Sequence, residues 1–524
     1  MAHWELSIDS RALVTLALAP LLVCAVFVWR QSRVHRRSRL PPGPPGLPLI
    51  GNLLDMPQND LSNRFSSWCK EYKSDMIYLN ILGGHIIIVN NHDILVDLFE
   101  KRSSIYSSRT KSTIAVDLMG WGWSLPFMPY GDEWRAHRRL FRKAFEDTEA
   151  NKLHQPHQVR ATHALLHNLL DSPRDWHAHL RLQAGASIMA LAYGINVLPS
   201  NDPYISVAEQ GIARLAEATV PGAYLVDTFP LLKYVPAWVP GAGFQRKTQE
   251  WKKLAVELLN SPFDAVKKEI ASGTATPSFT LRCLQDMDLA GDISAQETVI
   301  KNTAATVYAG GADSSVSATA TFILAMTLYP DVQRRAQTEL NAILGKGDLP
   351  RFGDEHRLPY LMAVVKECLR WGVVFPFSVP HTSDHDDIYR GYHIPKGTMV
   401  MPNTWAIMND PKHFPDPSAF KPERFLSADG KIDPSVLDPE VLGFGYGRRI
   451  CPGKEMAKGS LWLTAGSILA TFDISKATDE SGAVVEPSGE YELRVIRHPK
   501  PFECTIRVRS GEIEQMIWDI SSSA

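Results

Sequence analysis

The chain has 524 residues, of which 44% are hydrophobic and 21% charged, a composition typical of globular proteins. Its 55 basic and 57 acidic residues give a net charge of -2, so no global attraction to nucleic acid is expected. The six cysteines are widely spaced and form no CxxC pair, which argues against a disulfide scaffold or a zinc site and suits a reducing compartment.

An uncharged segment of 18 residues, from Ala12 to Trp29, lies near the N-terminus. It is about as long as the shortest helices that span a bilayer. Five arginines follow it, from Arg30 to Arg39, whereas only Arg11 precedes it closely. By the positive-inside rule, the bulk of the protein then lies on the cytosolic side. A cleaved signal peptide is the alternative, but it expects the opposite order of charges and apolar residues.

We therefore predict a membrane anchor with a basic flank over residues 1–39 and a stiff, proline-rich hinge over residues 40–51. Residues 52–524 are predicted to form one large domain, mainly α with a small β-sheet portion, because helical texture dominates the middle of the chain. The segment from Met76 to Asn91 predicts a hairpin that turns at Gly83 and Gly84.

Two helices are predicted in more detail. Ser294 and Glu297 resemble a capping box, and no proline follows before Pro330, so one long helix is expected there. A second helix is expected from Pro359, a favourable first-turn residue, to a stop at Gly372.

The predicted long helix contains two adjacent glycines, Gly310 and Gly311, followed by Asp313 and Ser314. A glycine inside a helix costs up to about 1 kcal/mol relative to alanine. Close packing of a neighbouring helix and close approach of a flat ligand both explain such a pair. In the second case the acid and the hydroxyl would line a groove with proton-transfer groups.

Three further charged residues invite two interpretations. Glu367 and Arg370 stand three residues apart on one helix face, which is most often an exposed ion pair worth less than about 1 kcal/mol. Arg424, in a proline-rich loop downstream, could instead join them in a network that pins this loop. Trp134 and Arg138 also share a helix face, in a basic segment that is either solvated surface or an anion-binding site.

The stretch "GFGYGRRICPG" surrounds a single cysteine, Cys451, with glycines and arginines. A thiolate on a haem iron pushes electron density toward the metal and favours O–O cleavage. Backbone N–H groups of a glycine-rich turn and the N-terminus of the following helix stabilise such an anion. An arginine beside the cysteine suits a carboxylate, and haem carries two propionates.

These residues fit the pattern F-x-x-G-x-R-x-C-x-G, and in this respect the chain resembles the cytochrome P450 family. The pattern is matched by Phe444, Gly447, Arg449, Cys451 and Gly453. The resemblance extends from the hydrophobic N-terminus through the proline-rich hinge "PPGPPG" to the C-terminus, and is greatest to microsomal (class II) members of basidiomycete fungi. It implies the cytochrome P450 fold preceded by one transmembrane helix.

The resemblance implies a role for each matching residue. Cys451 would be the metal ligand of haem b, Phe444 would pack beneath it, and Gly447 and Gly453 would shape the turn. Arg449, Trp134, Arg138 and His381 would contact the propionates. Gly310, Asp313 and Ser314 would form the oxygen-activation motif, in which Ser314 replaces the usual threonine. Glu367, Arg370 and Arg424 would form a structural triad.

The implied activity is that of a haem-thiolate monooxygenase, an oxidoreductase that inserts one oxygen atom from O2 into a terpenoid, steroid or aromatic compound. It implies secondary metabolism or xenobiotic oxidation and a single-pass protein of the endoplasmic reticulum membrane with a cytosolic catalytic domain. Electrons would come from an NADPH-cytochrome P450 reductase, with cytochrome b5 as an optional second donor, because the sequence has no nucleotide-binding glycine fingerprint of its own. The alternatives are a haem-thiolate isomerase or dehydratase and a non-catalytic haem-binding membrane protein.

Overall fold

The computed structural model describes residues 39–522, apart from residues 58–59, 147–151, 221 and 493. The predicted membrane anchor therefore lies outside the described residues, except for its last one, Arg39. Among the helices that are described, none is both long enough and apolar enough to cross a membrane.

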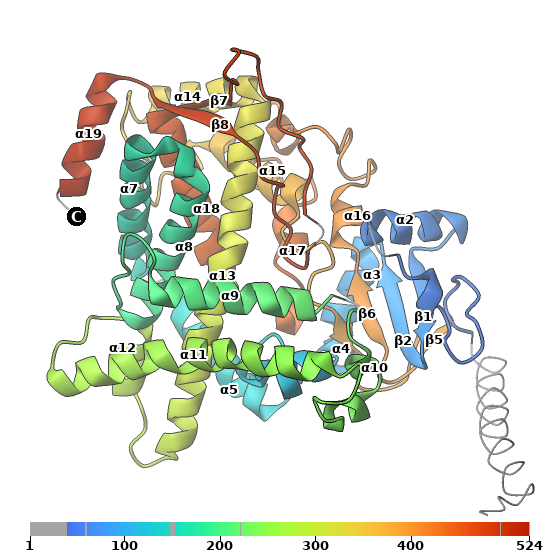
Figure 1. Cartoon of the computed structure of the whole chain (residues 1–524). Coiled ribbons are helices and arrows are strands. Elements are labelled where there is room, and N and C mark those ends of the chain that lie inside the picture. Colours follow the sequence, from blue (N-terminus) through green and yellow to red (C-terminus); the bar gives the residue numbers. More distant parts are fainter. Residues whose placement is uncertain (1–38, 58–59, 147–151, 221, 493, 523–524) are drawn as a thin grey trace, which may run out of the picture.

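The described chain is mainly helical, as expected from its sequence (Figure 1). The longer helices are α2 (Leu61–Glu71), α5 (Asp132–Phe141), α7 (Gln155–Asp171), α8 (Trp176–Tyr193), α9 (Pro203–Ala218), α11 (Gly243–Ser272), α13 (Ile293–Leu328), α14 (Pro330–Ile343), α15 (Pro359–Gly372), α18 (Lys454–Thr471) and α19 (Gly511–Ser522). The shorter ones are α3 (His92–Val96), α4 (Ser103–Tyr106), α10 (Leu225–Thr228), α12 (Phe279–Gln285), α16 (Thr404–Met408) and α17 (Pro439–Gly443).

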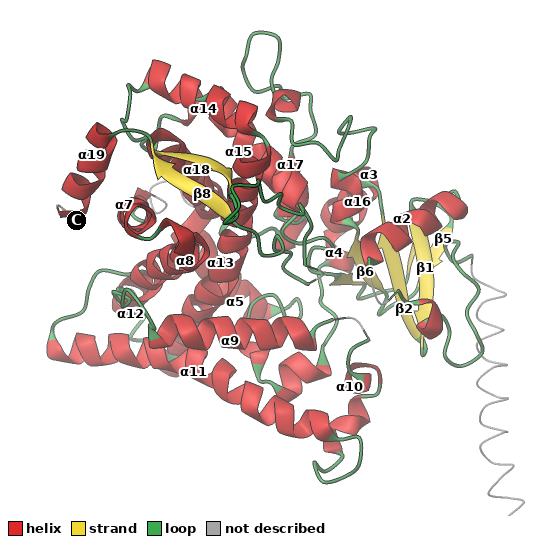
Figure 2. Cartoon of the chain, turned by 45° about the horizontal axis from the view of Figure 1, so that its top comes forward, coloured by secondary structure: helices red, strands yellow, loops and turns green. Residues whose placement is uncertain are grey.

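The strands form three small sheets; Figure 2 shows the strands β1, β2 and β6 of the largest sheet beside the helical body, and β8 among its helices. The largest has the order β1-β2-β6-β3, and the other two are the pairs β4-β5 and β7-β8. Their bounds are β1 (Met76–Ile81), β2 (Gly84–Val89), β3 (His381–Thr382), β4 (Asp387–Tyr389), β5 (Tyr392–Ile394), β6 (Met399–Pro402), β7 (Phe472–Lys476) and β8 (Cys504–Val508). β1 and β2 form the predicted antiparallel hairpin, in which Ile81 pairs with Gly84.

Helix α13 runs through the middle of the molecule (Figure 1). Its 36 residues make it about 54 Å long at 1.5 Å per residue. The predicted capping box is wrong in detail: Asp292 caps the helix, because its side chain accepts a hydrogen bond from the N–H of Ala295. Ser294 lies inside the first turn, and Glu297 pairs with Lys267 of α11 instead.

Both large hydrophobic clusters of the helical body include residues of α13. One cluster contains Phe322 and Ile323 together with residues of α7, α15 and α18, and the other contains Ala304 and Ala305 together with residues of α5, α8 and α11. The helix is therefore apolar nearly all round, as expected of a helix that crosses a protein core.

The proline-rich segment after Arg39 lies along the edge of the first sheet. The N–H of Tyr78 donates to the carbonyl of Pro42 at 2.9 Å, and the side chain of Asn52 donates to the carbonyl of Pro44. A Cβ atom at Gly43 would lie 2.1 Å from the carbonyl oxygen of Tyr78, so only glycine allows the segment to approach this closely. The first half of the hinge, from Pro42 to Pro44, is thus fastened to the body.

Candidate active site

Cys451 lies in a tight loop between the short 3-10 turn Gly447–Arg449 and helix α18. Its N–H donates to the carbonyl of Phe444 at 2.7 Å, which closes the loop. Gly447 has a φ of +52°, and a Cβ atom there would lie 2.3 Å from the carbonyl oxygen of Phe99. Gly447 is therefore required both by its backbone conformation and by the close approach of a second segment. Gly453 directly precedes α18, where its backbone conformation is ordinary.

The surroundings of the Cys451 sulfur have opposing effects on its acidity. Burial holds the pKa of the thiol above its ordinary value, and the backbone N–H of Gly453 and the positive charges of Arg138 and Lys454 offset this rise only in part. The N-terminus of α18 adds positive potential at the same place. A soft metal ion that binds the sulfur displaces the proton outright, so this loop suits a thiolate ligand.

The side chain of Arg449 donates hydrogen bonds to main-chain carbonyls and packs on an aromatic ring. It donates to the carbonyls of Ser107 at 2.7 Å and Met128 at 2.9 Å, and its guanidinium lies 4.6 Å from the ring centre of Trp134. Burial lowers the pKa of Arg449 to about 10. The Nε1 of Trp134 is buried and has no partner in the described part of the chain. Among the described residues, the positive charge of Arg449 therefore has no anionic partner, and the N–H of Trp134 has no acceptor.

Arg109 belongs to the same cluster, although the sequence analysis did not select it. It donates to the carbonyls of Val379 and Pro380 at 2.6 and 2.8 Å, and its buried Nε has no partner among the described residues. Burial and the neighbouring Arg449 hold the pKa of Arg109 well below its ordinary value. The sequence gives no local signal for Arg109, because it lies in a loop far from Cys451 along the chain.

His381, on β3, is buried and stacks on Phe99 with ring centres 3.9 Å apart. Burial and the charge of Arg109 hold the pKa of His381 well below its ordinary value, so the ring is neutral in this environment. Its Nδ1 lies 2.6 Å from the carbonyl of Tyr106 and must carry the proton, because a carbonyl only accepts. The Nε2 of the neutral ring is then an acceptor, and His381 offers a donor to an anion only after it gains a second proton.

Arg138, on α5, does not join the unpaired cations. One of its Nη atoms donates to the carbonyl of Ile450 at 2.7 Å, and the other pairs with Glu146. It therefore ties α5 directly to the loop of Cys451. Since a carboxylate of the chain already neutralises it, Arg138 differs from Arg109 and Arg449, for which the described residues provide no ion pair.

The middle of α13 opens to accessible space. Residues 302–308 and 316–327 of this helix are buried, whereas Gly310 is exposed. A Cβ atom at Gly310 would meet nothing within 4 Å, but one at Gly311 would lie 2.6 Å from Ile188 of α8. The two explanations for the glycine pair thus apply to different residues: Gly311 permits helix packing, and Gly310 borders a space in which a flat ligand fits.

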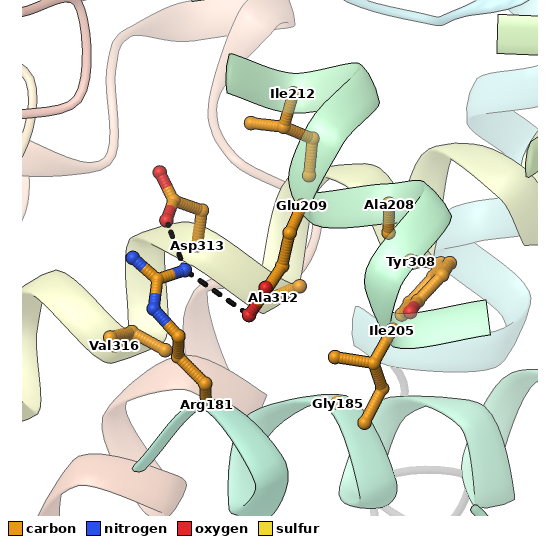
Figure 3. A pocket seen from close by; sticks show the side chains of 10 residues that line it. All are labelled: Arg181, Gly185, Ile205, Ala208, Glu209, Ile212, Tyr308, Ala312, Asp313 and Val316. Atoms are coloured by element: carbon orange, nitrogen blue, oxygen red, sulfur yellow. Dashed lines mark hydrogen bonds and ion pairs between the residues drawn. The ribbon is translucent and has the colours of Figure 1, made fainter. Parts of the chain in front are cut away.

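Asp313 and Ser314 lie just after the glycine pair in α13, but their side chains contact different partners. The Ser314 hydroxyl donates to the carbonyl of Gly310 at 2.8 Å, beside the open space. Asp313 faces α8 and α9, where it meets Arg181 at 3.6 Å (Figure 3). The structure therefore places the hydroxyl next to the open space and the acid at the back of the helix.

Glu367, Arg370 and Arg424 form a buried network. Arg370 donates two hydrogen bonds of 2.7 and 2.8 Å to the carboxylate of Glu367, and neither side chain has any exposed surface. Arg424 contacts the same carboxylate at 3.1 Å. Both arginines also donate to main-chain carbonyls of residues 415–419. The interpretation as an exposed ion pair is wrong, because the network holds this loop from within the protein.

These observations fit a haem. A haem propionate is a carboxylate, which matches two arginines without a carboxylate partner and the unpaired donors of Trp134 and Arg109. The flat ring matches the open space beside Gly310, and the iron matches the thiol of Cys451. Phe444 contributes its carbonyl to the Cys451 loop, and its half-buried ring remains available to pack near the sulfur.

Replacing Arg109 by methionine is expected to weaken haem retention by about tenfold or more, because a hydrogen bond to a charged group contributes about 1.5–3 kcal/mol. Haem content per protein and the rate of haem transfer to apomyoglobin measure this. Arg246, an exposed arginine of α11, provides the matched control, and its methionine variant should retain haem normally. Equal retention by both variants would contradict the role given to Arg109.

Comparison with known proteins gives a consistent result. The family model for cytochrome P450 matches residues 41–506. A tryptamine 4-monooxygenase of Psilocybe cyanescens is 44% identical over 499 residues, which cover 95% of this chain and 98% of that protein. Cytochrome P450 monooxygenase 98 of Postia placenta is 42% identical over 510 residues, covering 97% of both chains. Cytochrome P450 monooxygenase ple1 of Rhodocybe pseudopiperita is 40% identical over 507 residues, covering 97% of this chain and 96% of that protein.

Proposed function

Since this chain belongs to the cytochrome P450 family, we propose that it oxidises a hydrophobic small molecule in the secondary metabolism or xenobiotic oxidation of a fungus. Family membership makes the protein a haem b-binding monooxygenase, an oxidoreductase that incorporates oxygen from O2. The observation that carries the proposal is that Arg109 lies beside Arg449, two residues before Cys451, and that these two desolvated arginines have no carboxylate partner among the described residues.

The bound haem supplies oxygen activation and C–H oxidation. Cys451 would hold the metal through its sulfur, while Arg109, Arg449 and Trp134 would bind and orient the propionates. Gly310 leaves room for the ring and the substrate because it has no side chain. Ser314 would hold a proton at Oγ, and the absence of a β-methyl leaves this hydroxyl less constrained than that of a threonine.

The apolar segment Val373–Val379 supports a hydrophobic substrate. Phe375 is only half-buried, so part of its aromatic surface remains available for contact, whereas the ring of Phe377 packs on Phe65 with ring centres 5.6 Å apart. Terpenoids, steroids and aromatic compounds all suit such a wall. The relative whose name specifies tryptamine oxidation makes tryptamine the first aromatic compound to test.

An external electron donor follows from the absence of a nucleotide-binding fingerprint in the sequence. We assign this role to an NADPH-cytochrome P450 reductase, with cytochrome b5 as an optional second donor. Arg135, Arg139 and Arg142 are exposed on the outer side of the α5 segment, whose inner side carries Trp134 and Arg138. A basic surface this close to the candidate haem site suits an acidic redox partner.

Association with the endoplasmic reticulum membrane is supported by exposed apolar side chains after α9. In the short turns between α10 and α11, Leu231, Tyr234 and Trp238 are 79%, 73% and 80% exposed. Aromatic residues of this kind favour the interface between lipid and water. We infer that this loop contacts the membrane in addition to the predicted N-terminal anchor.

In a variant that lacks residues 1–39, replacing Leu231 and Trp238 by serine should reduce binding to phosphatidylcholine vesicles several-fold, because each substitution removes apolar surface from the lipid contact. Vesicle co-sedimentation measures the effect. Replacing Ile388, which is 69% exposed on β4, provides a control that should bind as the truncated parent does. Equal binding by all three proteins would contradict the second membrane contact.

The proposed function is tested with the purified holoenzyme, a fungal reductase and NADPH, incubated with tryptamine, a sesquiterpene and a steroid. A product heavier by one oxygen atom, labelled when 18O2 is supplied, is the expected result. Turnover without reductase would instead indicate an isomerase or dehydratase, and an intact haem spectrum without NADPH consumption would indicate a non-catalytic protein.

A further inference from the structure

The back of the oxygen-activation helix carries a network of charged groups that the family pattern does not specify. The Oδ2 of Asp313 lies 3.1 Å from the Nε2 of His498, and its Oδ1 lies 3.6 Å from Arg181 of α8. Arg181 also pairs with Glu209 of α9 at 3.3 Å (Figure 3). Thus both carboxylate oxygens of Asp313 have a partner on the side of α13 that faces away from Ser314.

His498 is held in this position by its own segment. The Ser317 hydroxyl of α13 donates to the carbonyl of Arg497, and the N–H of Arg497 donates to the carbonyl of Val374 at 2.9 Å. The Arg497 side chain donates to the carbonyl of Gly372 at 3.1 Å. His498 is therefore fastened between α13 and the end of α15, and only 7% of its surface is exposed.

The electrostatic environment keeps Asp313 ionised. Burial raises the pKa of the Asp313 carboxyl, but the hydrogen bond from His498 and the positive charges of His498, Arg181 and Arg494 outweigh it, so this pKa lies below its ordinary value. Other charged or titratable groups around the network are Glu209 and His177. Because its pKa is lowered, the Asp313 carboxylate holds a proton only briefly, and any proton that it passes on must come from one of its neighbours.

Only one of the two side chains bound to Asp313 can supply that proton. An arginine does not lose its proton in proteins, whereas a histidine exchanges one near neutral pH. We propose that His498 is the positioning and proton-relay residue that recharges Asp313 during turnover, an inference that rests on the proposed monooxygenase function. The Nε2–H bond of His498 breaks as an O–H bond forms at Oδ2 of Asp313.

Solvent supplies a proton to the other ring nitrogen first, so the ring is a cation when it releases its Nε2 proton and is neutral afterwards. The Nδ1 of His498 is buried and has no partner among the described residues, so the proton would reach it through an internal water molecule. The ring regains its starting form when it releases the Nδ1 proton to water and takes up a proton at Nε2. One proton enters from solvent for each proton that Asp313 passes on toward the Ser314 side of the helix, so charge balances over the cycle. His498 does not touch substrate or haem and acts through Asp313 alone.

The structure also offers a second place from which protons could reach Asp313, and the test must distinguish it from His498. A cavity of about 20 Å³, lined by Arg181, Glu209 and Asp313 among others, lies between α8, α9 and α13 (Figure 3). This volume accommodates a single water molecule with polar partners. If protons entered there, Glu209 would be the critical residue and His498 would not.

The test uses the holoenzyme with enough reductase that the rate of NADPH oxidation no longer depends on it, without added substrate. His498→Gln should lower this rate about tenfold, since glutamine can donate a hydrogen bond to Asp313 but cannot transfer its proton. The ratio of rates in H2O and D2O should rise, which a purely structural role would not cause. In an Asp313→Asn background the same substitution should have no further effect on the rate.

Lys500→Gln is the matched control, because Lys500 is an exposed cation two residues away that pairs with Glu490 and should leave the rate unchanged. Independently of activity, the lowering of the unfolding midpoint by His498→Gln should disappear in the Asp313→Asn background, as expected if the two side chains interact directly.

A wild-type rate for His498→Gln, additive losses with Asp313→Asn, or a loss confined to Glu209→Gln would each overturn the proposal. A wild-type holoenzyme that consumes no NADPH with tryptamine, the sesquiterpene or the steroid would instead refute the proposed function on which the relay depends. Intact haem content and an intact reduced carbon monoxide spectrum in every variant ensure that the comparison concerns proton supply.

Discussion

Replacing Cys451 by alanine should abolish NADPH-driven oxidation and eliminate the red-shifted Soret band that carbon monoxide gives with thiolate-ligated ferrous haem. The sulfur is the single soft ligand in the loop before α18. In the described part of the chain, no three histidine, cysteine or acidic residues are grouped so that they could hold a metal ion instead. Difference spectroscopy of the reduced protein with carbon monoxide measures the ligand directly.

Cys504 provides the matched control for this substitution. It lies on β8, where burial raises the pKa of its thiol to about 12, so it remains a neutral, structural side chain. Cys504→Ala should retain both the spectrum and turnover. Cys451→Ser adds a stricter comparison, since a harder oxygen ligand should bind iron without restoring the red-shifted band. Retention of that band in Cys451→Ala would refute the assignment of the thiolate.

Replacing Glu367 by glutamine should have the largest effect on stability. Arg370 and Arg424 would both lose their only carboxylate among the described residues while Arg370 remains fully buried, and breaking a buried ion pair of this kind costs about 3–5 kcal/mol. The loop of residues 415–421 would also lose its anchor. We expect a large loss of folded, haem-containing protein, measured by urea unfolding and by haem content per protein.

A second pair with the same spacing provides the control. Asp331 and Arg334 of α14 also stand three residues apart and form an ion pair, but 89% and 67% of their side-chain surface is exposed. Because solvent screens an exposed pair, Asp331→Asn should leave unfolding nearly unchanged. Similar losses for both variants would mean that spacing, rather than burial, determines the contribution of Glu367.

The sequence predicted local features well where a backbone conformation requires a particular residue type, such as glycine or proline. The hairpin of β1 and β2 follows from the position of its glycines, and α15 begins at Pro359 and ends at Gly372 as predicted, although Val373 rather than the glycine adopts the left-handed conformation at its end. The predicted capping box at Ser294 was wrong, because Asp292 caps α13 two residues earlier. Both residue types are good caps, and local sequence does not decide between neighbouring candidates.

The sequence by itself determined the family, the candidate ligand Cys451 and the residues of the Glu367 network, since these depend on residue types at fixed spacings. Tertiary structure decided which side chains remain unpaired and which way each one faces. Only folding brings Arg109 next to Arg449, leaves Gly310 open while Gly311 packs against Ile188, and places His498 against Asp313. The reason is physical: pairing and burial depend on segments far apart in the chain, and no local pattern encodes what a residue meets across the core.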